Sequence, residues 1–141
     1  MGEQLPSRGW RGEAHLASER GASRQFTDLL LEQLGQHGWS PAEVFAIHLA
    51  AEEAIVNAIV HGNRLDPGKR VHVVSAVSPD RVLITITDEG DGFDPSRVPD
   101  CTLDDRLDLP SGRGVMLMRS FMTRIEYNAK GNSVVMEKIR A

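Results

Sequence analysis

The sequence predicts a single α+β domain in which helices cover one face of a mainly antiparallel sheet. Three observations support this prediction. Two segments in the first half of the chain have apolar residues at helical spacing. Four later segments are rich in β-branched residues, and short turn sequences join them in pairs. The chain has 141 residues, which is the usual size of one domain.

The composition excludes several protein classes. Hydrophobic residues make up 40% and charged residues 26% of the chain, which excludes collagen-like, disordered and low-complexity proteins. The formal net charge is −4, so the chain lacks the basic excess of a small nucleic-acid-binding domain, and we expect no direct nucleic acid partner.

We expect a cytoplasmic protein without a membrane segment. The apolar run over residues 54–60 is interrupted by Asn57 and is far shorter than the about 20 residues that span a bilayer. The N-terminus has no positively charged region followed by an apolar core, so nothing in it directs export. Cys101 is the single cysteine and cannot form an internal disulfide, which suits a reducing compartment.

The N-terminal half is expected to contain a short strand and a first helix. Residues 1–12 are rich in glycine and predict a loose segment that leads into a strand over 14–17. The first helix is expected from Ala22 to about Leu34, followed by glycines that end it. Its apolar positions are Phe26, Leu29, Leu30 and Leu34.

A second helix is expected from Pro41 to His61. Ser40 and Glu43 have the spacing of a capping box, and a proline suits the first helical position. Gly62 is expected to end this helix in a left-handed conformation. The apolar stripe consists of Val44, Ile47, Ala51, Ala54, Ile55 and Ala58.

The C-terminal half is expected to form two hairpins around a long loop. The strands are residues 71–77 and 81–87, then 124–128 and 133–139. Residues 89–113 have no periodicity and collect glycine, proline and acidic residues. Compact domains rarely keep so long a loop without a purpose, so we expect a lid there. A short apolar helix from Val115 to Met122 should follow it.

The first motif with chemical potential lies on the second expected helix. Glu53 and Asn57 are four residues apart, so they share a face, and apolar residues flank them. Asparagine is a poor helix former that is usually kept for caps or contacts. The two residues predict a ligand site, and the alternative is that they lie at the solvent edge of an amphipathic helix.

Two further motifs contain glycine. Asp88 directly follows an expected strand, and Gly90 and Gly92 come soon after it. This segment is either part of a binding site or a common acidic turn. Residues 111–114, Ser-Gly-Arg-Gly, precede the short expected helix, where backbone N–H groups either approach a phosphate or form a flexible hinge. The chain contains no Gly-x-x-x-x-Gly-Lys-Ser/Thr sequence, which excludes a P-loop.

In this order, the three motifs resemble the ATP-binding domain of the gyrase, chaperone, histidine-kinase and mismatch-repair superfamily, the Bergerat fold. Residues 52–62, Glu-Glu-Ala-Ile-Val-Asn-Ala-Ile-Val-His-Gly, are most similar to bacterial anti-sigma-factor serine/threonine kinases. The resemblance covers nearly the whole chain. It implies a two-layer sandwich with a mixed, mainly antiparallel sheet, a histidine-kinase-like ATP-binding domain over residues 13–141, and an ATP lid over 93–111.

The resemblance also implies the roles of individual residues in binding ATP and Mg²⁺. Asn57 matches the magnesium ligand, and its amide oxygen is a suitable hard donor. Glu53 matches the general base that takes a proton from the attacking hydroxyl. Asp88 matches the residue that accepts a hydrogen bond from the adenine amine, which would favour ATP over GTP. The remaining expected nucleotide contacts are His61, Gly90, Gly92, Gly112, Arg113, Gly114 and Ser133.

Some of these residues also suit a purely structural role. His61 fits the negative end of the helix dipole, Ser133 can simply open a strand, and an arginine at 113 can simply be exposed. Glu52 is expected to be a solvated neighbour of Glu53, or to replace it as the base.

The lid departs from the related kinases, which often have an arginine just before its Ser-Gly. This chain has Pro110 there, which puts the efficiency of phosphoryl transfer in doubt. Arg106 could reach inward instead, although the acidic residues around it favour a local ion pair.

The implied function is that of an anti-sigma factor. Such a kinase phosphorylates an anti-sigma antagonist, a protein of the STAS type, and sequesters a sigma factor; related kinases are commonly homodimers. The first alternative is a non-catalytic module that binds ATP and regulates a partner. The second is a detached histidine-kinase ATP-binding domain, which is disfavoured because no dimerisation helix with a phosphoacceptor histidine precedes it in this sequence.

Overall fold

The computed structural model describes residues 9–90 and 121–140. In chain order, the elements are β1 (Trp10–Ala17), α1 (Arg24–Gln36), α2 (Pro41–Asn57), the π-helical turn η1 (Ala58–Gly62), β2 (Arg70–Val77), β3 (Arg81–Thr87), β4 (Arg124–Tyr127) and β5 (Ser133–Ile139). The expected lid over 93–111 lies outside the described residues, as does nearly all of the expected helix from Val115 to Met122.

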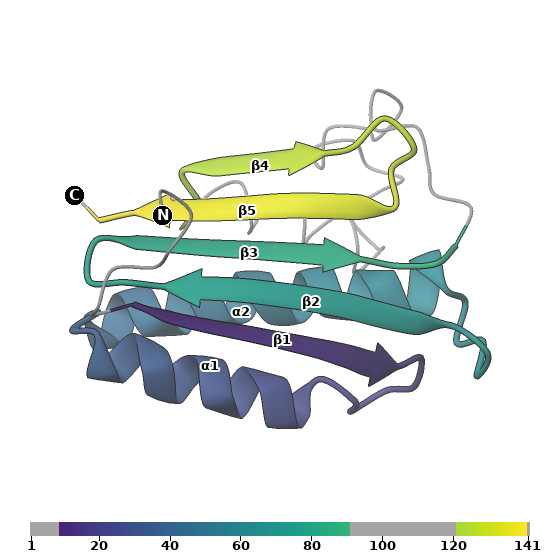
Figure 1. Cartoon of the computed structure of the whole chain (residues 1–141), viewed down its shortest axis with the longest axis horizontal. Coiled ribbons are helices and arrows are strands. Elements are labelled where there is room, and N and C mark those ends of the chain that lie inside the picture. Colours follow the sequence, from purple (N-terminus) through teal and green to yellow (C-terminus); the bar gives the residue numbers. More distant parts are fainter. Residues whose placement is uncertain (1–8, 91–120, 141) are drawn as a thin grey trace, which may run out of the picture.

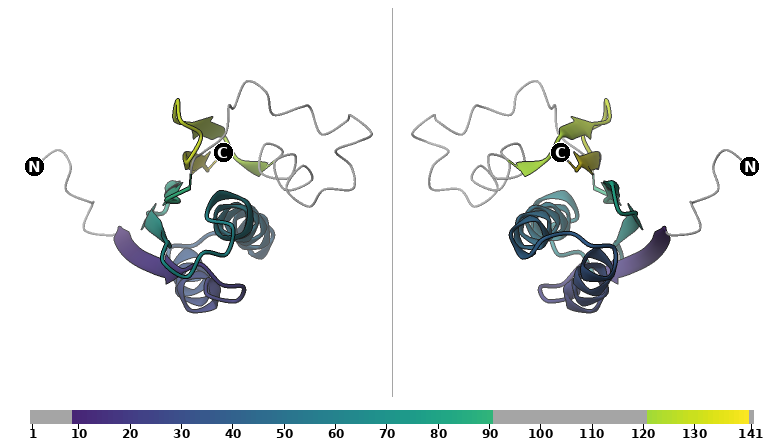
Figure 2. Two further views of the ribbon diagram at one scale, coloured as in Figure 1. Left: turned by 90° about the vertical axis from the view of Figure 1, so that its right-hand side faces the viewer. Right: turned by 90° about the vertical axis from the view of Figure 1, so that its left-hand side faces the viewer.

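The described strands form one five-stranded sheet in the order β1-β2-β3-β5-β4. Every neighbouring pair in it is antiparallel. Both helices lie on the same side of the sheet, and the opposite face carries no helix of the described part (Figures 1 and 2). The predicted α+β fold, with helices on one face of the sheet, is therefore confirmed.

The core lies between the sheet and the helices. Side chains alternate along β2 and β3, so that every second residue is buried. In β3 these residues are Val82, Ile84 and Ile86, and they meet the apolar side of α2, where Ile47 and Ile55 are almost fully buried. Met122, just before β4, belongs to the same core.

The first helix is displaced by two residues from its expected position. It begins at Arg24 and ends at Gln36. Gly38 has a φ of +84°, which an L side chain rarely adopts, and it ends the helix as expected. Gly35, which was also expected to end the helix, lies within it. Leu29, one of the four apolar positions, is 41% exposed, so the buried stripe of α1 is narrower than its apolar pattern.

The N-terminus of α2 has the predicted capping box. The Ser40 hydroxyl accepts from the Glu43 amide at 3.2 Å, and the Glu43 carboxylate accepts from the Ser40 amide at 3.1 Å. Pro41 occupies the first turn, where its missing N–H has no partner to lose.

The C-terminus of this helix differs from the prediction. The α-helix ends at Asn57 and continues as the single wide turn η1 to Gly62. Gly62 is not left-handed; the positive φ values near it are those of Arg64 (53°) and Leu65 (58°). The prediction of a left-handed cap at Gly62 is therefore wrong, and a tertiary contact with Asp88 requires this glycine instead.

The helix formed by α2 and η1 has the length and composition of a membrane span. It covers Pro41–Gly62 and has a mean hydropathy of 1.4. However, its isoleucines and several of its alanines pack into the core beneath the sheet, whereas Phe45 is 65% exposed. The core helix of a globular domain has the same properties, so this helix is weak evidence for a membrane.

The two hairpins form as predicted, and β1 is longer than predicted. β1 begins at Trp10 because the whole segment from Trp10 to Ala17 pairs in register with β2. Between β4 and β5, Gly131 has a φ of +82°, and the Asn128 carboxamide oxygen accepts from the amides of Gly131, Asn132 and Ser133.

Candidate nucleotide site

Helix α2 contributes two unpaired polar atoms. Oε2 of Glu53 and Oδ1 of Asn57 are buried, and neither has a hydrogen-bond partner in the described part of the chain. The two residues are one turn apart on α2 and therefore share a face. Because a buried polar atom without a partner costs about 1–3 kcal/mol, two such atoms on one face indicate that a ligand completes the site.

The two neighbouring carboxylates of α2 have different surroundings. Burial raises the pKa of Glu53 above its ordinary value, and the charge of Glu52 raises it further. Glu52 accepts from the Ser23 hydroxyl, at 3.1 and 3.0 Å to its two oxygens, and so connects the start of α1 to α2. Glu52 is therefore held by Ser23 rather than merely solvated, and Glu53 is the carboxylate with a free oxygen.

Asp88 follows the C-terminal end of β3 and is only 8% exposed. Its backbone is held by Asn132: the Asp88 amide donates to the Asn132 carbonyl at 2.8 Å, and the Asn132 side chain donates to the Asp88 carbonyl at 2.9 Å. The Gly90 amide donates to Oδ1 of Asp88 at 2.8 Å. Burial raises the pKa of Asp88, and this hydrogen bond from Gly90 opposes the rise.

Glycines bring the end of the helix against the Asp88 turn. A Cβ on Gly62 would lie 2.3 Å from Oδ2 of Asp88, and a Cβ on Gly90 would lie 1.9 Å from the carbonyl oxygen of Gly62. Neither separation is physically allowed, so both positions require glycine. Figure 1 shows the C-terminal ends of α2 and β3 at the same end of the molecule. The close contact of Gly62 with Asp88 thus brings η1, the turn that directly follows Asn57, against the strand motif.

Asn63 also connects these elements, and sequence reasoning did not identify it. Its side chain is 1% exposed and donates to the Ser18 hydroxyl at 2.9 Å and to the Arg70 carbonyl at 3.0 Å. Its Oδ1 accepts from the Glu89 amide at 2.7 Å. Asn63 thus binds the end of η1 to the turn that carries Asp88. The only sequence signal was an asparagine beside a His-Gly pair, which also suits an ordinary loop.

The chain matches the family model described as histidine kinase-like ATPase domain over residues 13–138. The chain belongs to the histidine kinase-like ATPase family. Among curated relatives, the anti-sigma F factor of Clostridium perfringens (strain SM101 / Type A) is 33% identical over 102 residues, which cover 68% of this chain and 72% of the relative. The anti-sigma F factor of Oceanobacillus iheyensis is 34% identical over 102 residues, covering 68% and 69%. The recognised resemblance is therefore confirmed.

Membership of the histidine kinase-like ATPase family implies that this domain binds ATP. Six of the predicted site residues lie in the described part of the chain: Glu53, Asn57, His61, Asp88, Gly90 and Ser133. His61 is exposed at the end of α2 and η1. The Ser133 hydroxyl shares a 2.7 Å hydrogen bond with the Thr87 hydroxyl, directly across from it on β3. The contacts of His61 and Ser133 with nucleotide stay predictions.

Four of the predicted nucleotide contacts lie outside the described residues: Gly92, Gly112, Arg113 and Gly114. Pro110 and Arg106, which the sequence singled out in the lid, lie there too.

The donor atoms fit a magnesium–nucleotide complex. The free amide oxygen of Asn57 is a hard, neutral ligand of the kind Mg²⁺ accepts beside phosphate oxygens. The free oxygen of Glu53, with its raised pKa, suits a group that accepts a proton.

Proposed function

We propose that this chain is an ATP-dependent protein serine/threonine kinase that acts as an anti-sigma factor. It transfers the γ-phosphoryl group of ATP to a hydroxyl of a partner protein. Membership of the ATPase family supports the use of ATP, and the similarity to anti-sigma F factors over two thirds of the chain supports the regulatory role.

The pair of unsatisfied oxygens on α2 carries the catalytic part of the proposal. A helix that served only as a core element would gain nothing from an unpaired carboxylate oxygen and an unpaired amide oxygen on the same face. A site that must hold a metal ion and accept a proton needs both of them.

Each residue then has one role. Asn57 would hold Mg²⁺, which would neutralise charge on the phosphate oxygens. Asp88 accepts a hydrogen bond from the adenine amine. Glu53 takes the proton as the partner hydroxyl oxygen bonds to the γ-phosphorus, the bond from that phosphorus to the bridging β,γ-oxygen breaks, and ADP leaves with that electron pair.

The proposed partners are a sigma factor and an anti-sigma antagonist of the STAS type. Phosphorylation of the antagonist leaves the sigma factor bound to this chain, and transcription from its promoters stays low. We place this activity in the cytoplasm, where sigma factors meet RNA polymerase, and propose a homodimer as the assembly.

The test is transfer of labelled phosphate from ATP and Mg²⁺ to a candidate antagonist. Glu53→Gln should lower the transfer rate by about 10²–10⁴-fold, because a general base contributes that much. The matched control is Glu52→Gln, which changes the neighbouring carboxylate held by Ser23 and should leave transfer within a few-fold of the original.

Two outcomes would contradict the proposal. Transfer that survives Glu53→Gln removes this residue as the base. ATP binding without any transfer to the antagonist favours the alternative of a non-catalytic regulatory module, which Pro110 in the lid would suit.

A further inference from the structure

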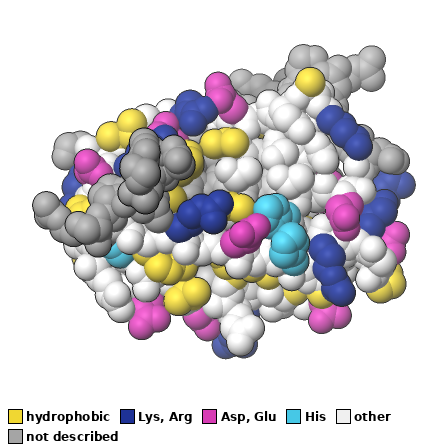
Figure 3. Space-filling model, viewed as in Figure 1, with side chains coloured by type: hydrophobic (Ala, Val, Ile, Leu, Met, Phe, Trp, Pro, Cys, Tyr) yellow, Lys and Arg dark blue, Asp and Glu magenta, His cyan; other side chains and the backbone are white. Residues whose placement is uncertain are grey.

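A cluster of three potential metal ligands lies on the face of the sheet that the helices leave open. His15 on β1 is directly opposite His72 on β2 in the strand register. Glu13 is two residues before His15, so its side chain points to the same face. Figure 3, which looks onto this face, shows histidine side chains beside an acidic one.

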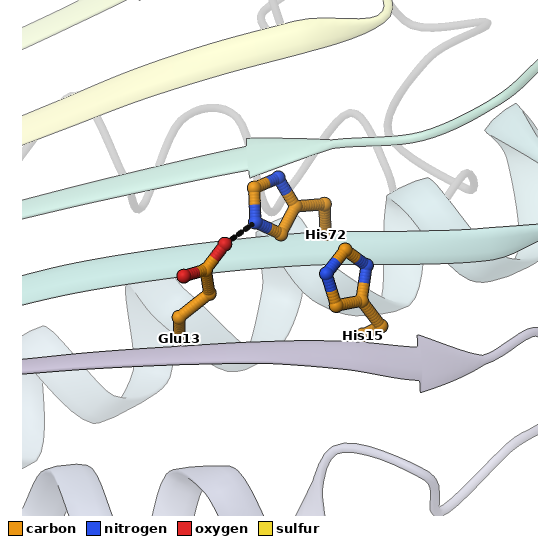
Figure 4. Close-up of side chains that lie close together, drawn as sticks. All are labelled: Glu13, His15 and His72. Atoms are coloured by element: carbon orange, nitrogen blue, oxygen red, sulfur yellow. Dashed lines mark hydrogen bonds and ion pairs between the residues drawn. The ribbon is translucent and has the colours of Figure 1, made fainter.

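The three side chains converge (Figure 4). Oε2 of Glu13 is 2.5 Å from Nε2 of His72. The His15 and His72 rings are stacked, with centroids 4.4 Å apart and an angle of 8° between their planes. One ligand atom from each residue lies within 4.8 Å of the other two.

The geometry points to a transition-metal site, best suited to Zn²⁺, formed by Glu13, His15 and His72. Ligand atoms at about 2.0–2.2 Å from a tetrahedral zinc ion are separated by about 3.3–3.6 Å. For a metal ion to bind, the Glu13–His72 pair has to open and the His15 ring has to turn out of its stack on His72. Water fills the fourth position, as in other zinc sites with three protein ligands.

A simple ion pair does not account for the whole cluster. Glu13 and His72 satisfy one another, and His15 is not needed for that contact. The ring nitrogens of His15 make no hydrogen bond within residues 9–90 and 121–140, although the ring is held parallel to its neighbour. His15 therefore offers a third donor with free nitrogens beside this pair.

The chemistry of the cluster selects against Mg²⁺ and Ca²⁺. Two of the three donors are imidazoles, which suit zinc, copper or nickel, whereas the hard cations prefer oxygen. Arg11 lies near Glu13 and contributes to lowering the pKa of that carboxyl, behind the larger effect of the hydrogen bond from His72. This positive charge weakens simple electrostatic attraction of a cation, so coordination must supply the affinity.

This site is separate from the nucleotide site. Glu53 and Asn57 belong to α2, which lies on the opposite face of the sheet (Figure 2). A metal ion bound by Glu13, His15 and His72 would join β1, an edge strand, to β2 and hold the strand pair together.

The experiment is a titration of the full chain, stripped of metal with a chelator, with Co²⁺ as the spectroscopic probe and Zn²⁺ as competitor. Excess Mg²⁺ is present and nucleotide is absent. We expect one Co²⁺ per chain, a visible absorption band that Zn²⁺ removes, and a rise in Tm with Zn²⁺. His15→Ala and His72→Ala should each weaken affinity by at least about tenfold, since even indirect metal contacts are worth that much.

The matched control is His48→Ala, which removes a half-buried histidine of α2 and should leave affinity unchanged. Glu13→Gln keeps the shape of the side chain and should also weaken binding, which guards against misfolding of the histidine variants. Three results would each overturn the proposal. They are unchanged metal affinity in both His15→Ala and His72→Ala, a loss of metal affinity in His48→Ala as large as in those variants, and a stoichiometry of one metal ion per two chains.

Discussion

At the scale of single residues, the two buried carboxyl groups of the site reduce the stability of the fold. Burial raises the pKa values of Glu53 and Asp88, so the folded chain binds their protons more tightly than the unfolded chain does. For such groups, the contribution to stability is greatest below the ordinary carboxyl pKa and is lost as pH rises through the raised value. Once these groups are ionised, their burial therefore costs stability.

This cost leads to a prediction for Glu53→Gln. The amide avoids the burial of a charge, so the variant should unfold at a higher temperature than the original chain at neutral pH. The difference should shrink as pH falls below 4.5, the ordinary pKa of the carboxyl, because Glu53 is then protonated in both states. Thermal unfolding followed by circular dichroism across this pH range measures it. A variant less stable than the original at neutral pH would contradict the account.

Asp88 should determine the choice of nucleotide. Replacing its carboxylate with an amide, Asp88→Asn, removes a charge-assisted hydrogen bond to adenine worth about 1.5–3 kcal/mol, so affinity for ATP should fall about 10–150-fold. The preference for ATP over GTP should decrease at the same time. Calorimetric titration with both nucleotides checks this, with Glu89→Gln as the control because Glu89 is exposed and pairs with the Arg70 amide. Unchanged affinity in Asp88→Asn would exclude the adenine contact.

Asn63 should be important for both stability and binding. Asn63→Ala removes a hydrogen-bond partner of the Glu89 amide and of the Ser18 hydroxyl. The free energy of unfolding should fall by about 1–3 kcal/mol for each of these groups that stays unsatisfied. Asn63→Asp keeps the acceptor for Glu89 but loses both donors, so it should also destabilise the chain. Urea unfolding tests both variants. If neither lowers the midpoint, then Asn63 does not hold the Asp88 turn.

At the scale of elements, η1 contacts the turn after β3, and we propose that this contact positions Asp88 for the nucleotide. Gly62→Ala should displace the Asp88 carboxylate, because the new Cβ would lie 2.3 Å from Oδ2. ATP affinity should fall at least about tenfold, by the loss of about 1.5 kcal/mol or more from the adenine hydrogen bond. Calorimetric titration with ATP measures this loss.

The matched control for Gly62→Ala is Gly35→Ala in α1. Its Cβ would meet nothing within 4 Å, so this variant should keep full affinity and gain about 0.5–1 kcal/mol of stability from better helix propensity. Full ATP affinity in Gly62→Ala would show that this contact does not position Asp88.

The elements differ in how far local sequence predicts them. The capping box at Ser40 and Glu43 and the two hairpins depend on neighbouring residues, and both were predicted. The end of α2 depends on a distant residue, Asp88, against which Gly62 packs. In sequence, a glycine required by a tertiary contact looks the same as a glycine that caps a helix. The prediction of a left-handed helix cap at Gly62 was wrong for this reason.

At the scale of the whole molecule, the fold class follows from periodicity, but the site does not. The motif Glu53-x-x-x-Asn57 and the acid Asp88 could be identified as candidates from the sequence and its family resemblance. Other features depend on contacts between residues far apart in the chain. These are the burial around the motif, the hydrogen bond from Ser23 to Glu52, and the contacts of Asn63 with three segments. Such contacts leave no local pattern, which is why these features required the structure.

The most direct measurement of the central claim is a crystal structure of the chain with Mg²⁺ and a non-hydrolysable ATP analogue. The account predicts the adenine amine on the Asp88 carboxylate, the metal ion on Oδ1 of Asn57, and Glu53 facing the γ-phosphate. A nucleotide bound elsewhere, or bound while Oε2 of Glu53 and Oδ1 of Asn57 stay without partners, would contradict it.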